Sequence, residues 1–175
     1  MPRFRRRLSA LLTAVFALFA LATAVAAPAS AGVPVKITLI GGANDQCLDV
    51  PRGTTDNKQQ VEIYYCKLND DDNQKWTFLP GRVAGWGQLR NVASGKCLDV
   101  RDTSTADGAA VQQYTCIDVP NQQWTWDAVS LNLKAYHSNL CLGAPRPEYK
   151  KKVWQYSCSA PAGFIWWNVS PGLYP

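Results

Sequence analysis

The chain contains two copies of the tetrapeptide Cys-Leu-Asp-Val, which begin at Cys47 and Cys97, and a third Cys-Leu pair that is followed by Gly143. An ionised carboxylate only accepts hydrogen bonds, and its two oxygens offer several lone pairs. Asp49 and Asp99 could therefore each accept hydrogen bonds from two neighbouring hydroxyl groups of one ligand. The third copy lacks the carboxylate, so we predict that it has kept a scaffold role and has lost the binding chemistry.

Aromatic and amide side chains recur at fixed distances from these aspartates. Each copy continues into a segment that ends in Tyr-x-Cys, namely VEIYYC, VQQYTC and VWQYSC, and the first two copies then close with NQKW and NQQW. A tyrosine ring offers an apolar platform for the C–H face of a sugar ring, and an amide supplies both a donor and an acceptor for hydroxyl groups. Together with the carboxylates, these side chains predict a carbohydrate site.

The three copies retain this set to different degrees. The first has Glu62 in place of the strand glutamine, which would repel Asp49 and could donate no hydrogen bond while ionised. In the third, Trp154 replaces the glutamine, and Gly163 and Phe164 replace the Asn-Gln pair. The middle copy is complete and is the best candidate.

Each of these residues also has a structural interpretation. An aspartate that enters a loop often caps its own backbone. The strand tyrosines occur in all three copies, including Tyr156 in the third, so they could be packing residues. Gln74 and Gln122 could mainly anchor the turn that holds the following tryptophan.

Catalytic, metal and cofactor sites are not expected. His137 is the only histidine, no G-x-S-x-G, H-E-x-x-H or P-loop motif occurs, and the cysteines lack the C-x2-C spacing of zinc sites. A glycosidase needs two opposed carboxylates, one of them with a raised pKa. We expect Asp49 and Glu62 to lie in an exposed site without the desolvation that this requires. The sequence therefore predicts a non-catalytic protein.

The first 31 residues have the features of a secretory signal peptide. Four arginines between residues 3 and 7 precede an apolar stretch over 8–27, and Ala29-Ser30-Ala31 fits cleavage before Gly32. The alternative is an uncleaved membrane anchor, because the stretch is nearly long enough to span a bilayer. Cleavage would remove four of the 18 basic residues and lower the formal net charge from +5 to +1. We expect a secreted, extracellular domain over 32–175, with no nucleic-acid footprint and no membrane insertion after cleavage.

One unit is repeated three times along the chain, at about 35–80, 85–128 and 129–170. Short segments rich in Val, Ile, Tyr and Trp lie between Gly, Asn, Asp and Pro, and no sustained helical periodicity follows Gly32. Three units are too few for a propeller, which needs about four blades. We predict an all-β, pseudo-threefold structure with a shared core. One leucine and one tryptophan per unit should fill that core: Leu39, Leu89, Leu133, Trp76, Trp124 and Trp166.

Six cysteines in an exported chain indicate a disulfide framework. Six cysteines allow 15 pairings, and the repeat favours one bond within each unit. The predicted bonds are Cys47–Cys66, Cys97–Cys116 and Cys141–Cys158. If the bonded segments run antiparallel with the cysteines directly opposite each other, Asp99 lies beside Tyr114 and Asp49 lies beside Tyr64.

The phased combination of Cys-Leu-Asp, Tyr-x-Cys and Gln-x-Trp resembles the ricin B-type lectin domain, which is also used as a family-13 carbohydrate-binding module, over roughly residues 35–170. The resemblance implies a disulfide-stabilised β-trefoil of twelve strands in three pseudo-symmetric repeats. It also implies binding of glycans or polysaccharides, most often of galactose type, without catalysis. The sugar-binding residues that it implies are Asp99, Gln112, Tyr114, Asn121 and Gln122 in the middle copy and Asp49, Tyr64, Asn73 and Gln74 in the first. A different class of alternative is a trefoil that acts through protein contacts, as a subunit of a toxin or enzyme or as a protease inhibitor.

Overall fold

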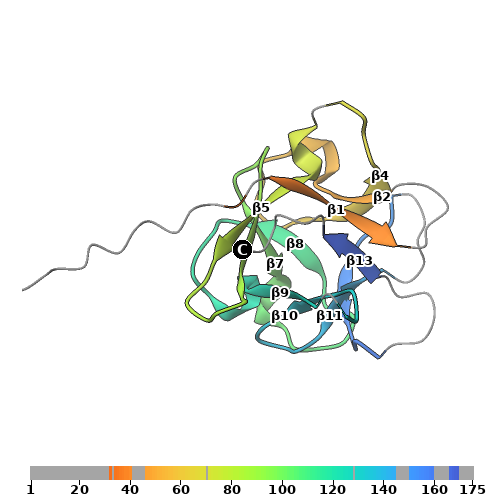
Figure 1. Ribbon diagram of the computed structural model, residues 1–175. Coiled ribbons are helices and arrows are strands. Elements are labelled where there is room, and N and C mark those ends of the chain that lie inside the picture. The colour runs from red at the N-terminus through yellow and green to blue at the C-terminus, as the bar shows by residue number, and fades with distance from the viewer. Residues whose placement is uncertain are drawn as a thin grey trace, which may run out of the picture.

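The computed structural model describes residues 32, 34–40, 46–69, 71–127, 129–144, 150–159 and 166–169. The predicted signal peptide over 1–31 lies outside these residues. The described chain consists of strands and short 3-10 turns that surround a common centre (Figure 1). None of its helices is long and apolar enough to cross a membrane.

Thirteen strands occur among the described residues, where the resemblance implied twelve, and the all-β prediction is confirmed. The strands are β1 (Val35–Ile40), β2 (Gln46–Asp49), β3 (Gln59–Gln60), β4 (Glu62–Tyr65), β5 (Lys75–Pro80), β6 (Gly87–Asn91), β7 (Cys97–Val100), β8 (Val111–Tyr114), β9 (Trp124–Asp127), β10 (Asn132–Ala135), β11 (Cys141–Gly143), β12 (Trp154–Tyr156) and β13 (Trp166–Val169). The 3-10 turns are η1 (Pro51–Gly53), η2 (Asp72–Gln74), η3 (Arg101–Thr103) and η4 (Pro120–Gln122). Strand β13 returns beside β1, which closes the three repeats on one another (Figure 1).

In each repeat the Cys-Leu strand pairs antiparallel with the Tyr-x-Cys strand. The pairs are β2 with β4, β7 with β8, and β11 with β12. At the position that follows each Cys-Leu pair, the residues that face each other across the two strands are Asp49 and Glu62, Asp99 and Gln112, and Gly143 and Trp154.

The predicted placement of each aspartate directly beside the tyrosine is wrong by two residues. Cys97 faces Tyr114, and its disulfide partner Cys116 lies beyond the end of β8. The disulfide therefore joins the strands diagonally, and the ladder that we inferred from opposed cysteines is displaced. Tyr114 and Gln112 are two residues apart and share one face of β8, so Tyr114 is a diagonal neighbour of Asp99.

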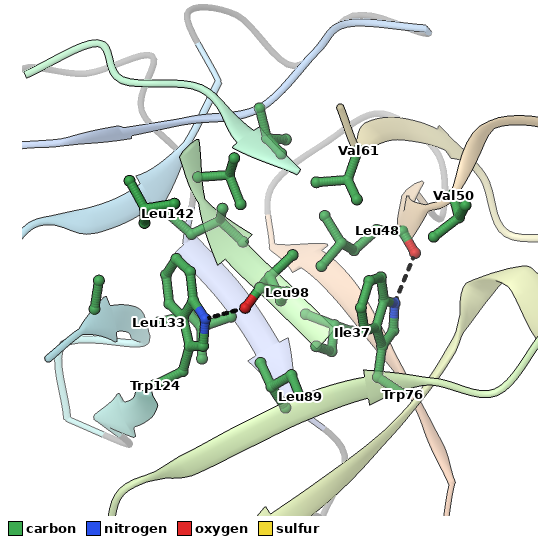
Figure 2. Packing of buried hydrophobic residues seen from close by; sticks show 14 of the residues in the cluster. Ile37, Leu48, Val50, Val61, Trp76, Leu89, Leu98, Trp124, Leu133 and Leu142 are labelled. Atoms are coloured by element: carbon green, nitrogen blue, oxygen red, sulfur yellow. Dashed lines mark hydrogen bonds between the residues drawn. The ribbon is translucent and has the colours of Figure 1, made fainter. Parts of the chain in front are cut away.

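The core contains the repeated leucines and tryptophans whose side chains are described. Leu89, Leu133, Trp76 and Trp124 are fully buried in one cluster (Figure 2), while the side chains of Leu39 and Trp166 lie outside the described residues. Each buried indole also makes a specific polar contact. Trp76 Nε1 donates to the Leu48 carbonyl at 3.1 Å, and Trp124 Nε1 donates to the Leu98 carbonyl at 3.0 Å. The closing tryptophan of each of these repeats is thus fastened to its own Cys-Leu-Asp segment.

The three predicted disulfides are confirmed as Cys47–Cys66, Cys97–Cys116 and Cys141–Cys158. Each bond closes a short loop within one repeat, and such a loop stabilises the fold by roughly 3 kcal/mol in the chain-entropy model.

Two strand glutamines join neighbouring repeats. Gln113 Nε2 donates to the carbonyls of Thr54 and Asp56 in the first repeat. Gln155 Nε2 in turn donates to the carbonyls of Ser104 and Ala106 in the second. A loop of one repeat is therefore held against the strand of the next, and the Gln113 contacts bring Lys58 of the first repeat to the pocket of the middle repeat.

Candidate functional site

The middle repeat holds a buried carboxylate between three amides. Asp99 is 4% exposed, and its Oδ1 accepts a hydrogen bond from Gln112 Nε2 at 2.9 Å. Its Oδ2 accepts from Asn121 Nδ2 at 2.9 Å and from Gln122 Nε2 at 3.1 Å. Burial raises the pKa of the Asp99 carboxyl, and the three amides oppose that rise because they stabilise the ionised form. The arrangement keeps a carboxylate at a fixed position near the surface.

The four residues Asp99, Gln112, Tyr114 and Asn121 line one hollow of about 270 Å³, as the sequence predicts for a common site. The remaining residues of its wall are Lys58, Asp102, Thr103, Ile117 and Val119. The tyrosine is only partly buried, so part of its ring is accessible from the hollow. Lys58 belongs to the first repeat, and it enters the wall because its N–H donates to the Gln113 carbonyl on β8.

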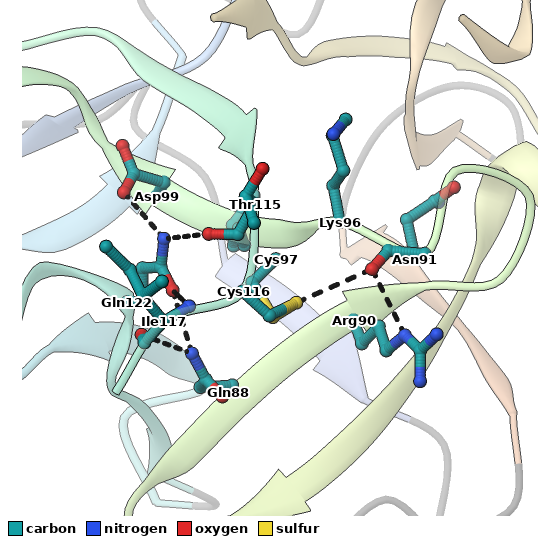
Figure 3. The surroundings of a disulfide bond; sticks show 12 residues. Gln88, Arg90, Asn91, Lys96, Cys97, Asp99, Thr115, Cys116, Ile117 and Gln122 are labelled. Carbon is teal, nitrogen blue, oxygen red and sulfur yellow. Dashed lines mark hydrogen bonds between the residues drawn. A yellow bond between two sulfur atoms is a disulfide. The ribbon is translucent and has the colours of Figure 1, made fainter. Parts of the chain in front are cut away.

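Gln122, the fifth predicted residue of this site, does not line the hollow. Its side chain is fully buried. Its Nε2 donates to Asp99 and to the Thr115 carbonyl, and its Oε1 accepts from the Ile117 N–H and from Gln88 (Figure 3). These four contacts use both N–H groups and both oxygen lone pairs of the side-chain amide, which favours the anchoring interpretation of this glutamine.

In the first repeat, two amides likewise donate to the buried Asp49, but a glutamate faces it in place of the glutamine. Asp49 Oδ2 accepts from Asn73 Nδ2 at 3.0 Å and from Gln74 Nε2 at 2.8 Å, and Glu62 faces it across the strand pair. The pKa of Asp49 is raised to about 6: burial is the largest cause and Glu62 adds to the rise, while Gln74, Lys67 and Asn73 oppose it. Our expectation of an exposed site without desolvation is therefore wrong, since Asp49 is only 2% exposed.

Asp49 and Tyr64 line a hollow of about 210 Å³ in the first repeat. Its other wall residues are Arg52, Glu62, Lys67 and Lys150. Lys67 Nζ lies 5.6 Å from the centre of the Tyr64 ring and 3.9 Å from Asp49 Oδ2. Asn73 and Gln74 are buried behind the carboxylate and are absent from the wall, as Gln122 is in the middle repeat.

The third repeat has kept the strand pair and lost the carboxylate. Gly143 faces Trp154, and both belong to the β11–β12 ladder. Gln155 is fully buried, where it donates to carbonyls of the second repeat and accepts from Ser138 Oγ at 2.8 Å. The positions Gly163 and Phe164, which replace the Asn-Gln pair, lie outside the described residues. The described part of this repeat thus contributes to the scaffold.

Several charged wall residues were missed by the sequence analysis: Arg52, Lys67 and Lys150 in the first pocket, and Lys58 and Asp102 in the middle one. Arg52 and Asp102 stand at the same offset after the two Cys-Leu-Asp-Val copies, which is the only signal that the sequence offered for them. Lys58 and Lys150 come from neighbouring repeats, and only the fold brings them to the pockets.

A family model for the ricin-type β-trefoil lectin domain matches residues 35–167. Among solved structures, a designed three-fold symmetric protein named ThreeFoil is 31% identical with a TM-score of 0.66, covering 76% of this chain and 96% of that one. An exo-β-1,3-galactanase from Clostridium thermocellum is 25% identical with a TM-score of 0.63, over 76% of this chain and 29% of that chain. The agglutinin from Abrus precatorius shares the fold at 22% identity and a TM-score of 0.64, over 78% of this chain and 48% of that one.

These matches confirm the predicted β-trefoil. The match to the lectin family model supports carbohydrate binding as its general function. With phased Cys-Leu-Asp and Gln-x-Trp segments, three disulfides within repeats and a model match across nearly the whole described fold, the chain belongs to the ricin-type β-trefoil lectin family.

Proposed function

We propose that the protein is a secreted, non-catalytic carbohydrate-binding protein whose main site is the middle-repeat pocket. In this proposal the first-repeat pocket is the weaker site for neutral sugars, and the third repeat serves the scaffold. The ligands are glycans or polysaccharides that display galactose-type or related sugars, as the family resemblance implies.

The observation that carries the proposal is the hydrogen-bonding capacity left over in the middle pocket. Three of about four lone-pair positions of the Asp99 carboxylate are occupied, so one remains for a sugar hydroxyl. Asn121 Oδ1 accepts no hydrogen bond from any described residue, and Gln112 Nε2 has a second N–H beyond the one given to Asp99. Two acceptors and a donor beside the Tyr114 ring match a sugar that has both hydroxyl groups and a C–H face.

The same inventory in the first pocket is less suited to a neutral sugar. Asn73 Oδ1 already accepts from Lys67 Nζ at 3.1 Å. Glu62 stands where the middle repeat has Gln112, and it supplies no donor while ionised. Lys67 also lies over the Tyr64 ring that would form the platform.

We expect weak binding of single sugars and stronger binding of polymers. A hexose has about 12 heavy atoms, and at roughly −0.3 kcal/mol for each atom the binding free energy is about −4 kcal/mol, or near-millimolar. More than one pocket on a rigid body raises the apparent affinity for a surface that displays many copies of the sugar.

The test is a glycan array and a polysaccharide pull-down with the protein recovered from the culture medium, followed by the same assays on Asp99→Asn. This substitution keeps the shape and removes the charge, so binding of neutral galactose-type ligands should become undetectable. A charge-assisted hydrogen bond contributes about 1.5–3 kcal/mol of the roughly 4 kcal/mol available. Asp49→Asn is the matched control in the first repeat and should cost less.

Near-UV circular dichroism must first show that each variant is folded. The middle-site assignment would be abandoned if folded Asp99→Asn bound these ligands as well as the parent. Binding of a protein partner without any glycan would favour the protein-contact alternative, and release of reducing ends from a bound polysaccharide would contradict the non-catalytic role. N-terminal sequencing of the secreted protein should begin at Gly32.

A further inference from the structure

The first and middle pockets have equivalent walls whose charges differ. Each wall contains the carboxylate after Cys-Leu, the strand tyrosine and a lysine from a neighbouring repeat. The two lysines are equivalent, because Lys58 N–H donates to the Gln113 carbonyl and Lys150 N–H donates to the Ile63 carbonyl, each with a positive φ. The lysine is therefore common to both pockets, and the difference in charge arises at other positions.

The first difference is a reversal of charge in the 3-10 turn after each Cys-Leu-Asp-Val segment. Arg52 in η1 has φ 57°, and Asp102 in η3 has φ 56°, so the two residues occupy the same position in the same turn. Both line their respective pockets. No described residue forms a hydrogen bond or an ion pair with the exposed Arg52 guanidinium, which leaves its donors available to a ligand.

The second difference is an added cation on the opposite wall. The backbone N–H groups of Lys67 and Ile117 each donate to the motif glutamine at 2.9 Å, so these residues are equivalent too. Lys67 Nζ is held beside the pocket by Asn73 Oδ1 at 3.1 Å and by the Asp49 carboxylate. The middle pocket has the neutral Ile117 side chain there.

The third difference introduces a carboxylate that has its own counter-ion. Glu62 replaces Gln112, and Lys152 Nζ lies 2.8 Å from Glu62 Oε2. The first pocket therefore has three cations in its wall against two carboxylates. Outside the wall, Lys152 pairs with Glu62, and Asp71 Oδ2 lies 3.9 Å from Lys67 Nζ, so these two outer charges offset each other. The middle pocket has one lysine against two carboxylates.

We propose that the first-repeat pocket binds an acidic sugar, meaning a glycan residue that carries a carboxylate or a sulfate group, while the middle pocket binds neutral sugars. This inference rests on the proposed carbohydrate-binding function. Asp49 accepts a ring hydroxyl, and the anionic substituent lies between Arg52 and Lys67. An arginine binds a planar carboxylate or a sulfate through two parallel N–H donors, and the lysine adds a compact point charge.

The arrangement explains why the pocket retains a carboxylate and cations together. A uniformly basic pocket would bind any anion, whereas a carboxylate in the same wall repels an anion that has no hydroxyl to donate. An acidic sugar satisfies both groups, because its hydroxyl donates to Asp49 and its anionic group accepts from Arg52. Free sulfate or acetate should therefore bind poorly at this site.

Isotope-edited NMR titrations of the full secreted protein can follow each pocket separately through the Lys67 and Ile117 backbone amides. The probes are a galacturonate oligosaccharide, a sulfated galactose oligosaccharide and a neutral galacto-oligosaccharide. We expect either or both acidic probes to shift Lys67, with an affinity that falls about tenfold between 50 and 500 mM salt because exposed charges are screened. Whichever acidic probe shifts Lys67 identifies the anion as a uronate or a sulfate ester. The neutral probe should shift Ile117 with little dependence on salt.

Reciprocal variants supply the matched control. Arg52→Asp should weaken binding of the acidic probe at the first pocket by about tenfold or more and leave neutral binding at the middle pocket unchanged. Asp102→Arg together with Ile117→Lys should give the middle pocket measurable affinity for the acidic probe. This inference is overturned if acidic and neutral probes bind the first pocket equally, or if Arg52→Asp has no effect. Neutral binding that depends on Asp99 would still leave the proposed function in place. No shift at either pocket with any probe overturns both.

Discussion

Replacing Gln122 with methionine separates a bracing role of the Gln-x-Trp glutamine from a ligand contact. The side chain is fully buried. Its Nε2 donates to Asp99 Oδ2 at 3.1 Å and to the Thr115 carbonyl at 3.0 Å, and its Oε1 accepts from Ile117 N at 2.9 Å and from Gln88 Nε2 at 2.8 Å. Methionine is similar in length and flexible enough to fill the same space, so the change removes mainly the hydrogen bonds.

The cost follows from the partners that methionine leaves behind. The carbonyl of Thr115 and the N–H of Ile117 are partly buried backbone groups, and an unpaired buried group costs about 1–3 kcal/mol. Gln88 is partly exposed and can turn to water, and Asp99 keeps Gln112 and Asn121. We therefore expect the free energy of unfolding to fall by about 2–4 kcal/mol, a large part of the 5–15 kcal/mol of an ordinary domain.

Urea denaturation followed by near-UV circular dichroism measures this loss. Gln74→Met, which removes the equivalent contacts in the first repeat, should cost a similar amount. Gln123→Met is the matched control, because the described bond of that side chain is to the exposed Asp118, and it should change stability by less than about 0.5 kcal/mol. If Gln122→Met left stability within that margin but abolished glycan binding, the side chain would act as a ligand contact and our reasoning would be refuted.

Three further predictions concern charge, cross-links and the core. The pKa of Asp49 is raised from 3.8 to about 6, mainly by burial, so the folded protein binds this proton more tightly than the unfolded chain does. The contribution of Asp49 to the free energy of unfolding therefore rises as the pH falls from about 6 to about 4. Urea denaturation from pH 4 to 7 should show a flatter pH profile for Asp49→Asn than for the parent, and identical profiles would contradict this. Replacing Cys141 and Cys158 together with alanine should lower the free energy of unfolding by roughly 3 kcal/mol while neutral glycans still bind the middle pocket, and loss of that binding in a folded variant would count against a scaffold role. Trp124→Phe should cost about 2–4 kcal/mol through the cavity and the lost bond to the Leu98 carbonyl, and calorimetry that found an unchanged melting temperature would refute its place in the core.

The fold could be predicted because its markers are phased along the chain. The Cys-Leu pairs, the Tyr-x-Cys segments and the closing tryptophans recur in the same order, so the disulfides and the burial of Trp76 and Trp124 follow from the repeat alone. The members of the middle pocket were predicted through the family resemblance, and Asp99 and Asn121 also recur in the first copy as Asp49 and Asn73.

The register and the depth of each side chain could not be predicted in the same way. A disulfide fixes which strands are neighbours, but it does not fix their register. Cys116 lies beyond the end of β8, and the pairing that we predicted from directly opposed cysteines was therefore wrong by two residues. The sequence also cannot tell an amide that lines the pocket from one that is buried behind the carboxylate, and Asn121 and Gln122 are adjacent examples of the two. Lys58 and Lys150 reach the pockets from other repeats, so no local sequence pattern predicts that they line them.

The third repeat bears on why the other two have kept an aspartate at all. Burial of an ionised carboxylate is unfavourable, as the raised pKa values of Asp49 and Asp99 indicate. The equivalent strand pair in the third repeat forms with Gly143 at that position, and its disulfide and ladder are intact. The strand pair itself therefore does not need the carboxylate, whereas in the middle repeat three buried amides donate to Asp99 and hold it at the pocket wall. A buried carboxylate that the strand pair can form without, and that keeps an unused lone pair at the pocket wall, is what the proposed sugar contact requires, and the same carboxylates are therefore the first residues to substitute in a binding assay.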